Sequence, residues 1–356
     1  MSKKRVAIIC GGRSSEHPIS CISARGVLSA IDSTAFETCL IGITEDGAWV
    51  QLKSADDFVT GKDGLPHVPK NAPLISADIK GFTSANGQKI EIDLVFPLLH
   101  GAYGEDGTIQ GFFEMAGMPY VGSGVLASSV AMDKTFAKPI YSDFGLKVAD
   151  GITVHQRDWS ENKELELAKI AALGLPIFIK PARSGSSRGT SKVKNVSEIA
   201  AAIEVAHEHD PRAMVEVAIV GREIECAVLE IAGKARPSVL GEIKDHEPHE
   251  FYDCEAKYLD GSTSFDIPAD IPVDIARRVS EAAVTAFEAL GCEGLARVDF
   301  FLTPDNEIII NELNTLPGFT EKSVFPMLWQ ASGKSYSEII TQLCESAMNR
   351  SQNVVR

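Results

Sequence analysis

The sequence predicts an open α/β sheet at the N-terminus, followed by two α+β units rich in antiparallel strands. Two observations carry this prediction. Short apolar runs alternate with helical stretches over the first 125 residues, and beyond Gly221 the strand-like runs lengthen. The 356 residues correspond to about two to three domains of roughly 150 residues each. We expect domains at residues 1–125, 126–220 and 221–356.

The N-terminal unit is predicted from apolar runs that end in glycine-rich loops. Val6 to Cys10 stops at two glycines, which is typical of a buried parallel strand. Ligands of open α/β sheets bind at the carboxyl ends of the strands, where both glycine-rich loops of this unit lie. In order we expect a strand (6–10), a loop (11–20), a helix (22–31), two strands (36–43 and 93–99), a loop (100–107), a helix (109–116) and a strand (119–121).

The later units are predicted from the same signals. In the central unit we expect helices over 132–144 and 197–209 and strands over 176–180 and 213–219. In the C-terminal unit we expect strands over 223–231, 238–243, 295–303 and 307–313, a charged loop over 244–260, and helices over 273–290 and 336–349.

Composition excludes several classes of protein. The net charge of −15 argues against a general binder of nucleic acid or anionic membranes. Seven cysteines without C-x-x-C or zinc spacing suit reduced thiols. The apolar run after the basic N-terminus is too short for a signal peptide, and no stretch approaches the roughly 18 apolar residues of a membrane span. We therefore expect a soluble cytoplasmic protein.

Three motifs that would indicate other chemistry are incomplete. The loop at Gly11–Gly12 lacks the spacing of the dinucleotide fingerprint G-x-G-x-x-G, which removes the main support for a dehydrogenase. Gly333-Lys334-Ser335 resembles the end of a P-loop, but position 328 is leucine where the first glycine is needed. His246 to Glu250 is not H-E-x-x-H, and Pro248 blocks a helix there.

The loop from Arg183 to Ser191 combines glycines, hydroxyl side chains and two arginines directly after a predicted strand. Backbone N–H groups and hydroxyls in such a loop can wrap phosphate oxygens, with Lys180 as a nearby point charge. The alternative is a polar hairpin turn on the surface.

A hairpin near the C-terminus holds the strongest group of candidate residues. If its turn centres on Asp305–Asn306, Asp299 faces Glu312 and Arg297 faces Asn314, with Ile308 and Ile310 on the same face. Two carboxylates and an amide suit Mg²⁺ bound with nucleotide phosphates. A shift of one residue in the strand pairing would distribute these side chains over both faces of the hairpin. The alternative is a solvated polar face on an edge hairpin.

Asn314 leads into Thr315-Leu316-Pro317-Gly318, a turn suited to presenting a backbone N–H. Together with Arg297, such an N–H could hold an oxyanion.

The motifs together resemble the D-alanine–D-alanine ligase family of the ATP-grasp superfamily, almost from end to end. The resemblance begins at Gly11 to His17 and is most specific in five segments: HGAYGEDG (100–107), the glycine loop (185–189), FYDCEAKY (251–258), ARVD (296–299) and NELNTLPGFT (311–320). It implies an ATP-grasp fold preceded by the N-terminal α/β domain.

The resemblance implies a reaction in two steps. ATP phosphorylates the carboxylate of one D-alanine, and the amine of a second D-alanine then displaces phosphate to give D-alanyl-D-alanine for peptidoglycan synthesis. Two Mg²⁺ ions, with Mn²⁺ as a substitute, and a cytoplasmic homodimer are implied as well. Both steps concentrate negative charge, which cations and arginine stabilise.

The resemblance also assigns roles by position. Glu16 would bind the ammonium of the first D-alanine, with His100 near its carboxylate, and Glu16, Ser186 and Tyr258 would form a hydrogen-bonded cluster. Arg297 and the Gly318 N–H would stabilise the tetrahedral intermediate, and Ser323 would bind the second carboxylate. The metal ligands would be Asp299, Glu312 and Asn314. The nucleotide-binding residues would be Lys134, Lys180, Ser187, Glu216, Val217, Ile219, Glu223, Lys257, Asn311 and Glu312.

Three positions depart from the family pattern. Val217 stands where relatives often carry a polar residue, Arg188 where they carry a small apolar one, and Cys254 where an aromatic is common. Tyr258 favours an amine over D-lactate as the second substrate, because relatives that make the ester typically lack this tyrosine.

Two alternative functions remain open at this stage. One is another carboxylate–amine ligase of the superfamily, such as a D-alanine–D-serine ligase. The other is a nucleotide-binding regulator that has lost catalysis, against which the joint presence of Arg297, Asp299, Glu312 and Asn314 argues.

Overall fold

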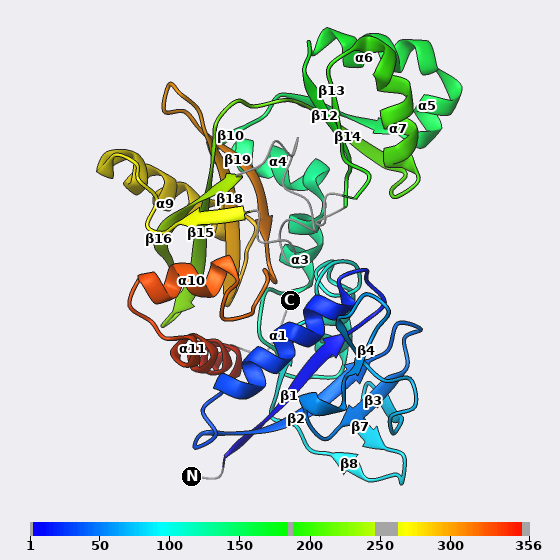
Figure 1. Ribbon diagram of the computed structural model, residues 1–356, viewed down its shortest axis with the longest axis vertical. Coiled ribbons are helices and arrows are strands. Elements are labelled where there is room, and N and C mark those ends of the chain that lie inside the picture. The colour runs from blue at the N-terminus through cyan, green and yellow to red at the C-terminus, as the bar shows by residue number, and fades with distance from the viewer. Residues whose placement is uncertain (1–2, 184–187, 246–262, 351–356) are drawn as a thin grey trace.

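The computed structural model describes residues 3–183, 188–245 and 263–350. The predicted site residues Ser186, Ser187, Lys257 and Tyr258, and Cys254, lie outside these ranges. Within these ranges, three larger sheets form the framework: an N-terminal sheet, a six-stranded C-terminal sheet, and a central four-stranded sheet in a lobe of its own (Figure 1). The prediction of an α/β unit followed by antiparallel-rich α+β units is confirmed.

The N-terminal sheet has the order β3(Trp49–Leu52)-β2(Phe36–Ile43)-β1(Lys4–Gly11)-β9(Leu94–Pro97). β1 pairs in parallel with both β2 and β9, and only β3 is antiparallel. Val6, Ile8 and Cys10 face α1(His17–Ala30) and α11(Tyr336–Asn349), whereas Ala7 and Ile9 face the side of α2(Thr108–Met115). Because both faces are covered, β1 reads as one continuous apolar run.

Two expectations in this unit are wrong in detail. The first helix begins at His17 rather than at residue 22, because Pro18 lies in its first turn, where a missing N–H has no cost. The segment 119–121 makes a single parallel bridge, Tyr120 to Val95, instead of a strand. Short elements that were not predicted connect β3 to β9: η1(Ala55–Asp57), β4(Val59–Thr60), β5(Pro66–His67), β6(Ile75–Asp78), β7(Gly81–Ser84) and β8(Lys89–Ile90).

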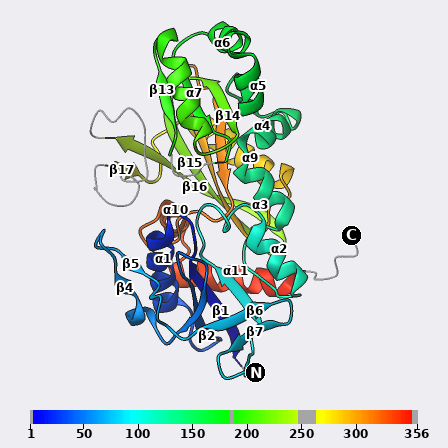
Figure 2. The same ribbon diagram turned by 90° about the vertical axis from the view of Figure 1, so that its right-hand side faces the viewer.

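The central lobe is an antiparallel sheet backed by helices (Figure 2). Its order is β11(Gly151–His155)-β14(Arg212–Val217)-β12(Ile177–Pro181)-β13(Ser191–Val193). Ile170, Ile203 and Val215 are fully buried in its core. The helices of the lobe are α5(Gln156–Glu161), α6(Lys163–Ala172), η2(Val196–Glu198) and α7(Ile199–His207).

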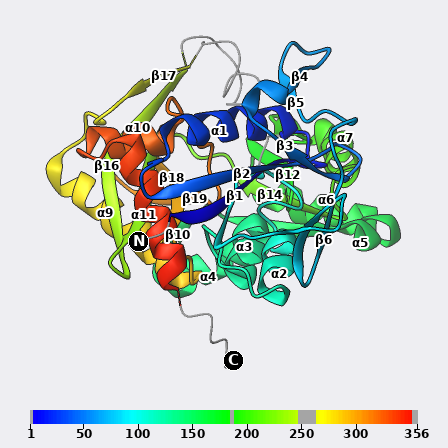
Figure 3. The same ribbon diagram turned by 90° about the horizontal axis from the view of Figure 1, so that it is seen from below.

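The C-terminal sheet has the order β10(Lys147–Val148)-β19(Ile308–Asn314)-β18(Leu295–Leu302)-β15(Arg222–Ile231)-β16(Lys234–Asp245)-β17(Thr263–Asp266). One face packs on α9(Val273–Ala289), α3(Val125–Met132) and α4(Lys134–Asp143). On the other face, Ala227, Leu229 and Leu295 join the core shared with α1 and α11, and α10(Val324–Ala331) lies there too. In Figure 1, α1, α10 and α11 lie between the two sheets. The view from below shows α1 on one side of β1 and β2 and α2 on the other (Figure 3).

The helix expected over 132–144 forms as α4, which begins at Lys134, and a separate helix that was not predicted, α3, precedes it. α3 ends before Asp133, and the Asp133 carboxylate accepts a hydrogen bond from the Thr135 N–H at 3.1 Å, which caps α4. The same carboxylate pairs with Arg212 of β14. Asp133 therefore starts α4 at Lys134 and ties that helix to the central lobe.

Replacing Asp133 by alanine tests this double role. The Asp133→Ala variant loses the cap and leaves Arg212, whose side chain is 16% exposed, without this partner. We expect the free energy of unfolding to fall by about 3–5 kcal/mol, the range for breaking a buried ion pair. Urea unfolding measures it. Asp143→Ala, at the exposed end of the same helix, should change it by about 0.5 kcal/mol or less. Equal effects of the two changes would contradict the assignment.

Candidate functional site

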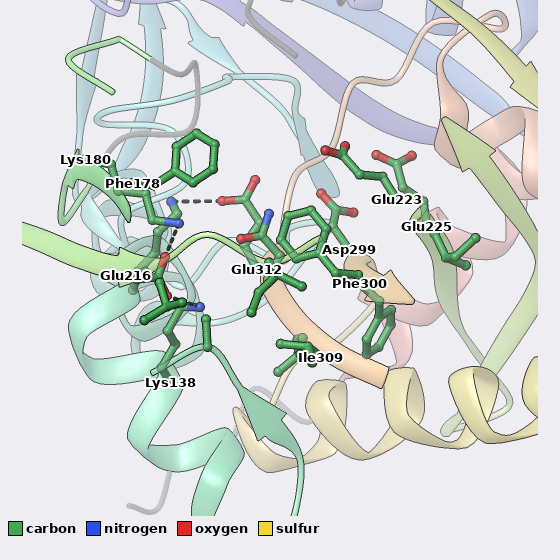
Figure 4. A pocket seen from close by; sticks show the side chains of 18 of the residues that line it. Lys138, Phe178, Lys180, Glu216, Glu223, Glu225, Asp299, Phe300, Ile309 and Glu312 are labelled. Carbon is green, nitrogen blue, oxygen red and sulfur yellow. Dashed lines mark ion pairs between the residues drawn. The ribbon is translucent and has the colours of Figure 1, made fainter. Parts of the chain in front are cut away.

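A pocket lies between the central sheet and the C-terminal sheet (Figure 4). Phe178 of β12 and Ile309 of β19 supply apolar walls, and charged side chains from both sheets and α4 surround the rest. Every predicted nucleotide residue that the structure describes lines this pocket: Lys134, Lys180, Glu216, Val217, Ile219, Glu223, Asn311 and Glu312.

The carboxylate of Glu216 stands between two lysines. Lys138 contacts Oε1 and Lys180 contacts Oε2. Burial alone would raise the pKa of Glu216, but the two positive charges outweigh it and lower that pKa to about 2. Glu216 is therefore ionised at neutral pH. Lys138 was not among the predicted residues; its only sequence signal is its position one helical turn after Lys134.

The predicted hairpin forms, and the pairing at the site is as expected: Asp299 faces Glu312, and Arg297 faces Asn314. The turn itself differs from the prediction. Leu302 pairs with Ile308, and if that register continued, Asn311 would lie opposite Asp299. A bulge between Asp299 and Phe300 shifts the register by one residue, so that Glu312 lies opposite Asp299 instead.

The bulge also overturns one prediction. Ile308 and Ile310 were expected to share a face with Glu312 and Asn314, but they pack with Leu313 against the core on the other side of the sheet. The extra residue, Asn311, shifts the alternation by one, so that Glu312 joins Ile309 on the pocket side.

Arg297 is held by two carboxylates. Its Nε and Nη2 donate to the two oxygens of Asp299 at 2.8 and 2.7 Å, and Nε lies 3.1 Å from Glu225 Oε1. Asn314 Nδ2 donates to Asp299 Oδ2 at 3.3 Å. Glu225, on β15 opposite Asp299, was missed because only the sheet pairing brings it to the site. The guanidinium plane is thus fixed against two carboxylates that line the pocket.

Lys134 and Glu312 form an ion pair at 2.9 Å, with their side chains 8% and 13% exposed. A small cavity beside them is also lined by Asn314 and Glu105. Burial, together with the nearby charges of Glu16 and Glu312, raises the pKa of Glu105 to about 8, although the Gly101 N–H, which donates to its Oε2 at 2.6 Å, acts in the opposite direction. Glu105 was not among the predicted residues, although it lies within the 100–107 loop.

His100 is buried, and both ring nitrogens have protein partners. Because the Leu316 carbonyl can only accept, Nδ1 donates to it at 3.0 Å, and Nε2 then accepts from Ser23 Oγ at 3.1 Å. Burial lowers the pKa of His100, so the ring is neutral at pH 7. His100 thereby links the N-terminal sheet to the turn after β19.

Glu16 lies at the N-terminus of α1 and faces the same region. The negative charge of Glu16 acts to raise the pKa of both His100 and Glu105. A Cβ on Gly101 would come 2.7 Å from Glu16 Oε2, and Gly101 has a φ of +73°, so only glycine allows this approach.

The turn that contains Gly318 is buried and tied at both ends. His100 binds Leu316 before it, and the Tyr336 hydroxyl donates to the Phe319 carbonyl at 2.7 Å after it. Ser323 precedes α10, and its Oγ accepts from the Thr320 N–H at 3.0 Å.

A metal ion would need ligands besides protein carboxylates here. In residues 3–183, 188–245 and 263–350, no three His, Cys, Asp or Glu side chains are grouped to hold one. Asp299 and Glu312, with the Asn314 amide beside them, are an all-oxygen set that fits a hard cation sharing its remaining sites with phosphate. Every helix in the described part of the chain is too short or too polar to cross a membrane.

Known proteins resemble this chain over nearly its whole length. Residues 5–123 match the family model for the D-ala D-ala ligase N-terminus, and residues 140–345 match that for the D-ala D-ala ligase C-terminus. D-alanine–D-alanine ligases of an Arthrobacter species and of Streptomyces coelicolor are 48% and 44% identical. These alignments cover 98% and 97% of this chain and 95% and 93% of the relatives.

Two solved structures share the fold. The D-Ala:D-Ser ligase VanG from Enterococcus faecalis superposes with a TM-score of 0.85 at 38% identity, over 97% of this chain and all of that one. The D-alanine–D-alanine ligase from Coxiella burnetii gives 0.82 at 33% identity, over 98% and 96%. The chain therefore belongs to the D-alanine–D-alanine ligase family, ATP-dependent enzymes that join two D-alanines for peptidoglycan precursor synthesis.

Proposed function

We propose that this chain joins two D-alanines. The pocket of Figure 4 would bind the nucleotide, and Arg297 would act on the D-alanine substrates. The γ-phosphoryl group of ATP passes to one D-alanine carboxylate, giving D-alanyl phosphate and ADP. The amine of the second D-alanine attacks that carbonyl, loses a proton, and expels phosphate. The observation that carries the proposal is the hairpin: it sets Asp299 opposite Glu312 in the lining of a lysine-lined pocket and holds Arg297 against Asp299.

In this proposal the nucleotide lies between the two sheets. Its base contacts the segment from Glu216 to Ile219 at the apolar wall formed by Phe178, and Glu223 meets the ribose. Lys134 and Lys180 meet the phosphates, together with Ser187 and Lys257. Backbone contacts suffice at Val217, whose side chain offers no hydrogen bond.

Asp299, Glu312 and Asn314 would hold two Mg²⁺ ions, or Mn²⁺, with the nucleotide phosphates completing the coordination. When bound, such ions neutralise charge that develops on the transferring phosphoryl group. The protein's own part is to fix these oxygens by pairing, through the Arg297 fork and the Lys134 ion pair.

The substrates would lie against the Arg297 side of the hairpin. Glu16 would bind the ammonium of the first D-alanine, and Ser186 and Tyr258 would complete a cluster with it. The Gly318 N–H and Arg297 would hold the oxygen of the tetrahedral intermediate. Ser323 would bind the second carboxylate, and His100 would keep the 315–319 turn in place.

D-serine is the rival second substrate, because VanG, at 38% identity, is a D-Ala:D-Ser ligase. We favour D-alanine because the curated relatives at 43–48% identity carry that name. We further propose a cytoplasmic homodimer with units at 1–125, 126–220 and 221–356. The deciding measurement is phosphate release from MgATP with D-alanine alone, or with D-alanine plus D-serine, the products being identified by mass. ATP binding without D-amino-acid-dependent release would refute the ligase function.

Removing the arginine fork tests the oxyanion role. Arg297→Ala should lower kcat by about 10²–10³-fold, the usual loss for one oxyanion donor, with a smaller change in ATP affinity. Steady-state phosphate release and direct ATP titration measure the two effects. Arg277→Ala, on the exposed face of α9, is the matched control and should keep normal turnover. Near-normal turnover of Arg297→Ala would remove this residue from the mechanism.

Tyr258 provides a test of specificity. Tyr258→Phe should raise activity toward D-lactate relative to D-alanine, because the family resemblance links this tyrosine to use of an amine. Competition between the two acceptors in one reaction gives the ratio directly. Tyr120→Phe, whose hydroxyl donates to Glu114 instead, should leave the ratio unchanged. An unaltered ratio in Tyr258→Phe would exclude a specificity role.

A further inference from the structure

Lys138 is the most deeply buried cation of the nucleotide pocket. Its side chain is 4% exposed, compared with 15% for Lys180, and both contact the same carboxylate, Glu216. The three side chains come from different elements: Lys138 from α4, Lys180 from β12 and Glu216 from β14 (Figure 4).

Their geometry gives the two lysines different freedom. Glu216 pairs with Phe178 in the sheet, so Lys180, two residues along the same strand, is its diagonal neighbour on one face. Both lysines line the pocket, but Lys180 is the more exposed of the two, so it can turn toward a bound phosphate. Lys138 approaches from the opposite side, out of a helix that Asp133 and Arg212 fix to β14.

A single lysine could not both neutralise Glu216 and bind a nucleotide phosphate. If Lys180 left Glu216 for a nucleotide, a carboxylate that is 5% exposed would lose its only cation, and burying an unpaired charge is strongly unfavourable. With Lys138 on the other oxygen, Glu216 keeps a partner throughout. It also stays an ionised acceptor, which suits a base that presents an amine rather than a carbonyl oxygen.

We propose that Lys138 is a positioning residue of the nucleotide pocket: it holds Glu216 in place, releases Lys180 to the nucleotide, and so favours a base with an exocyclic amine. The inference rests on the proposed nucleotide roles of Glu216 and Lys180. It adds a residue that touches neither base nor phosphate.

The test is nucleotide binding in the absence of D-alanine, by calorimetry with Mg²⁺ and either ATP or inosine triphosphate, which carries a carbonyl in place of the amine. Lys138→Met should weaken ATP binding about tenfold or more and reduce the preference for ATP over inosine triphosphate about fivefold. Lys147→Met, an exposed lysine on β10, should change neither value more than about twofold. Because turnover is not measured, a chain that binds ATP but ligates nothing would refute the proposed function without affecting this test.

Repeating the change in a Glu216→Gln variant controls for a folding defect. In that variant Lys138→Met leaves no buried carboxylate without a cation. In that background the same change should alter ATP affinity less than about threefold, because Lys138 acts through Glu216. Three results would overturn the proposal: ATP affinity of Lys138→Met within twofold of normal, equal losses for ATP and inosine triphosphate, or an undiminished loss in the Glu216→Gln background. The second result would indicate a purely structural link between α4 and the central lobe.

Discussion

The bulge at Asn311 is the constraint on which the arrangement of the site depends. β18 and β19 leave their turn in a register that would set Asp299 opposite Asn311 and turn Glu312 toward the core. One extra residue in β19 returns Glu312 to the pocket side, keeps Ile310 in the core and brings Leu313 into the core as well. A bulge leaves a residue outside the ladder, and here the Lys134–Glu312 pair and the Arg297–Asp299 fork offset that loss. Lys134, Arg297 and Asn314 would otherwise face different partners.

The cations around this hairpin are paired with carboxylates. Four cations (Lys134, Lys138, Lys180 and Arg297) meet four carboxylates (Glu216, Glu225, Asp299 and Glu312), and each is in contact with at least one opposite charge. A pocket whose cations are already paired, and which Glu223 lines as a further carboxylate, cannot accept a naked triphosphate without disturbing those pairs. A triphosphate that brings its own divalent cations adds little net charge, which is the physical reason that we pair the nucleotide with Mg²⁺.

The sequence predicted elements best where local signals and tertiary packing agree. The strand at Phe36–Ile43 and the helix at Tyr336–Asn349 match to the residue, the latter because Ser335 and Glu338 form a capping box. The two-residue strands between β3 and β9 were missed because so short a run has no periodicity. At the site, the facing pair Asp299 and Glu312 was predicted, although from a different turn register that needed no bulge. The side on which Ile310 lies was not, because a bulge has no sequence signal here. Glu225, Lys138 and Glu105 become site residues only through sheet order and helix docking.

The 315–319 turn shows how the separate units act on one point. His100, at the end of the N-terminal sheet, binds the Leu316 carbonyl, and Tyr336 of α11 binds the Phe319 carbonyl. Asn314, which ends β19 and faces Arg297 of β18, lies directly before the same turn. A backbone N–H stabilises an oxyanion best when it needs no reorganisation during the reaction. Because the Gly318 peptide is clamped from both sides by groups that are themselves buried, its N–H is set by the packing of two sheets and a helix, and not by the turn alone.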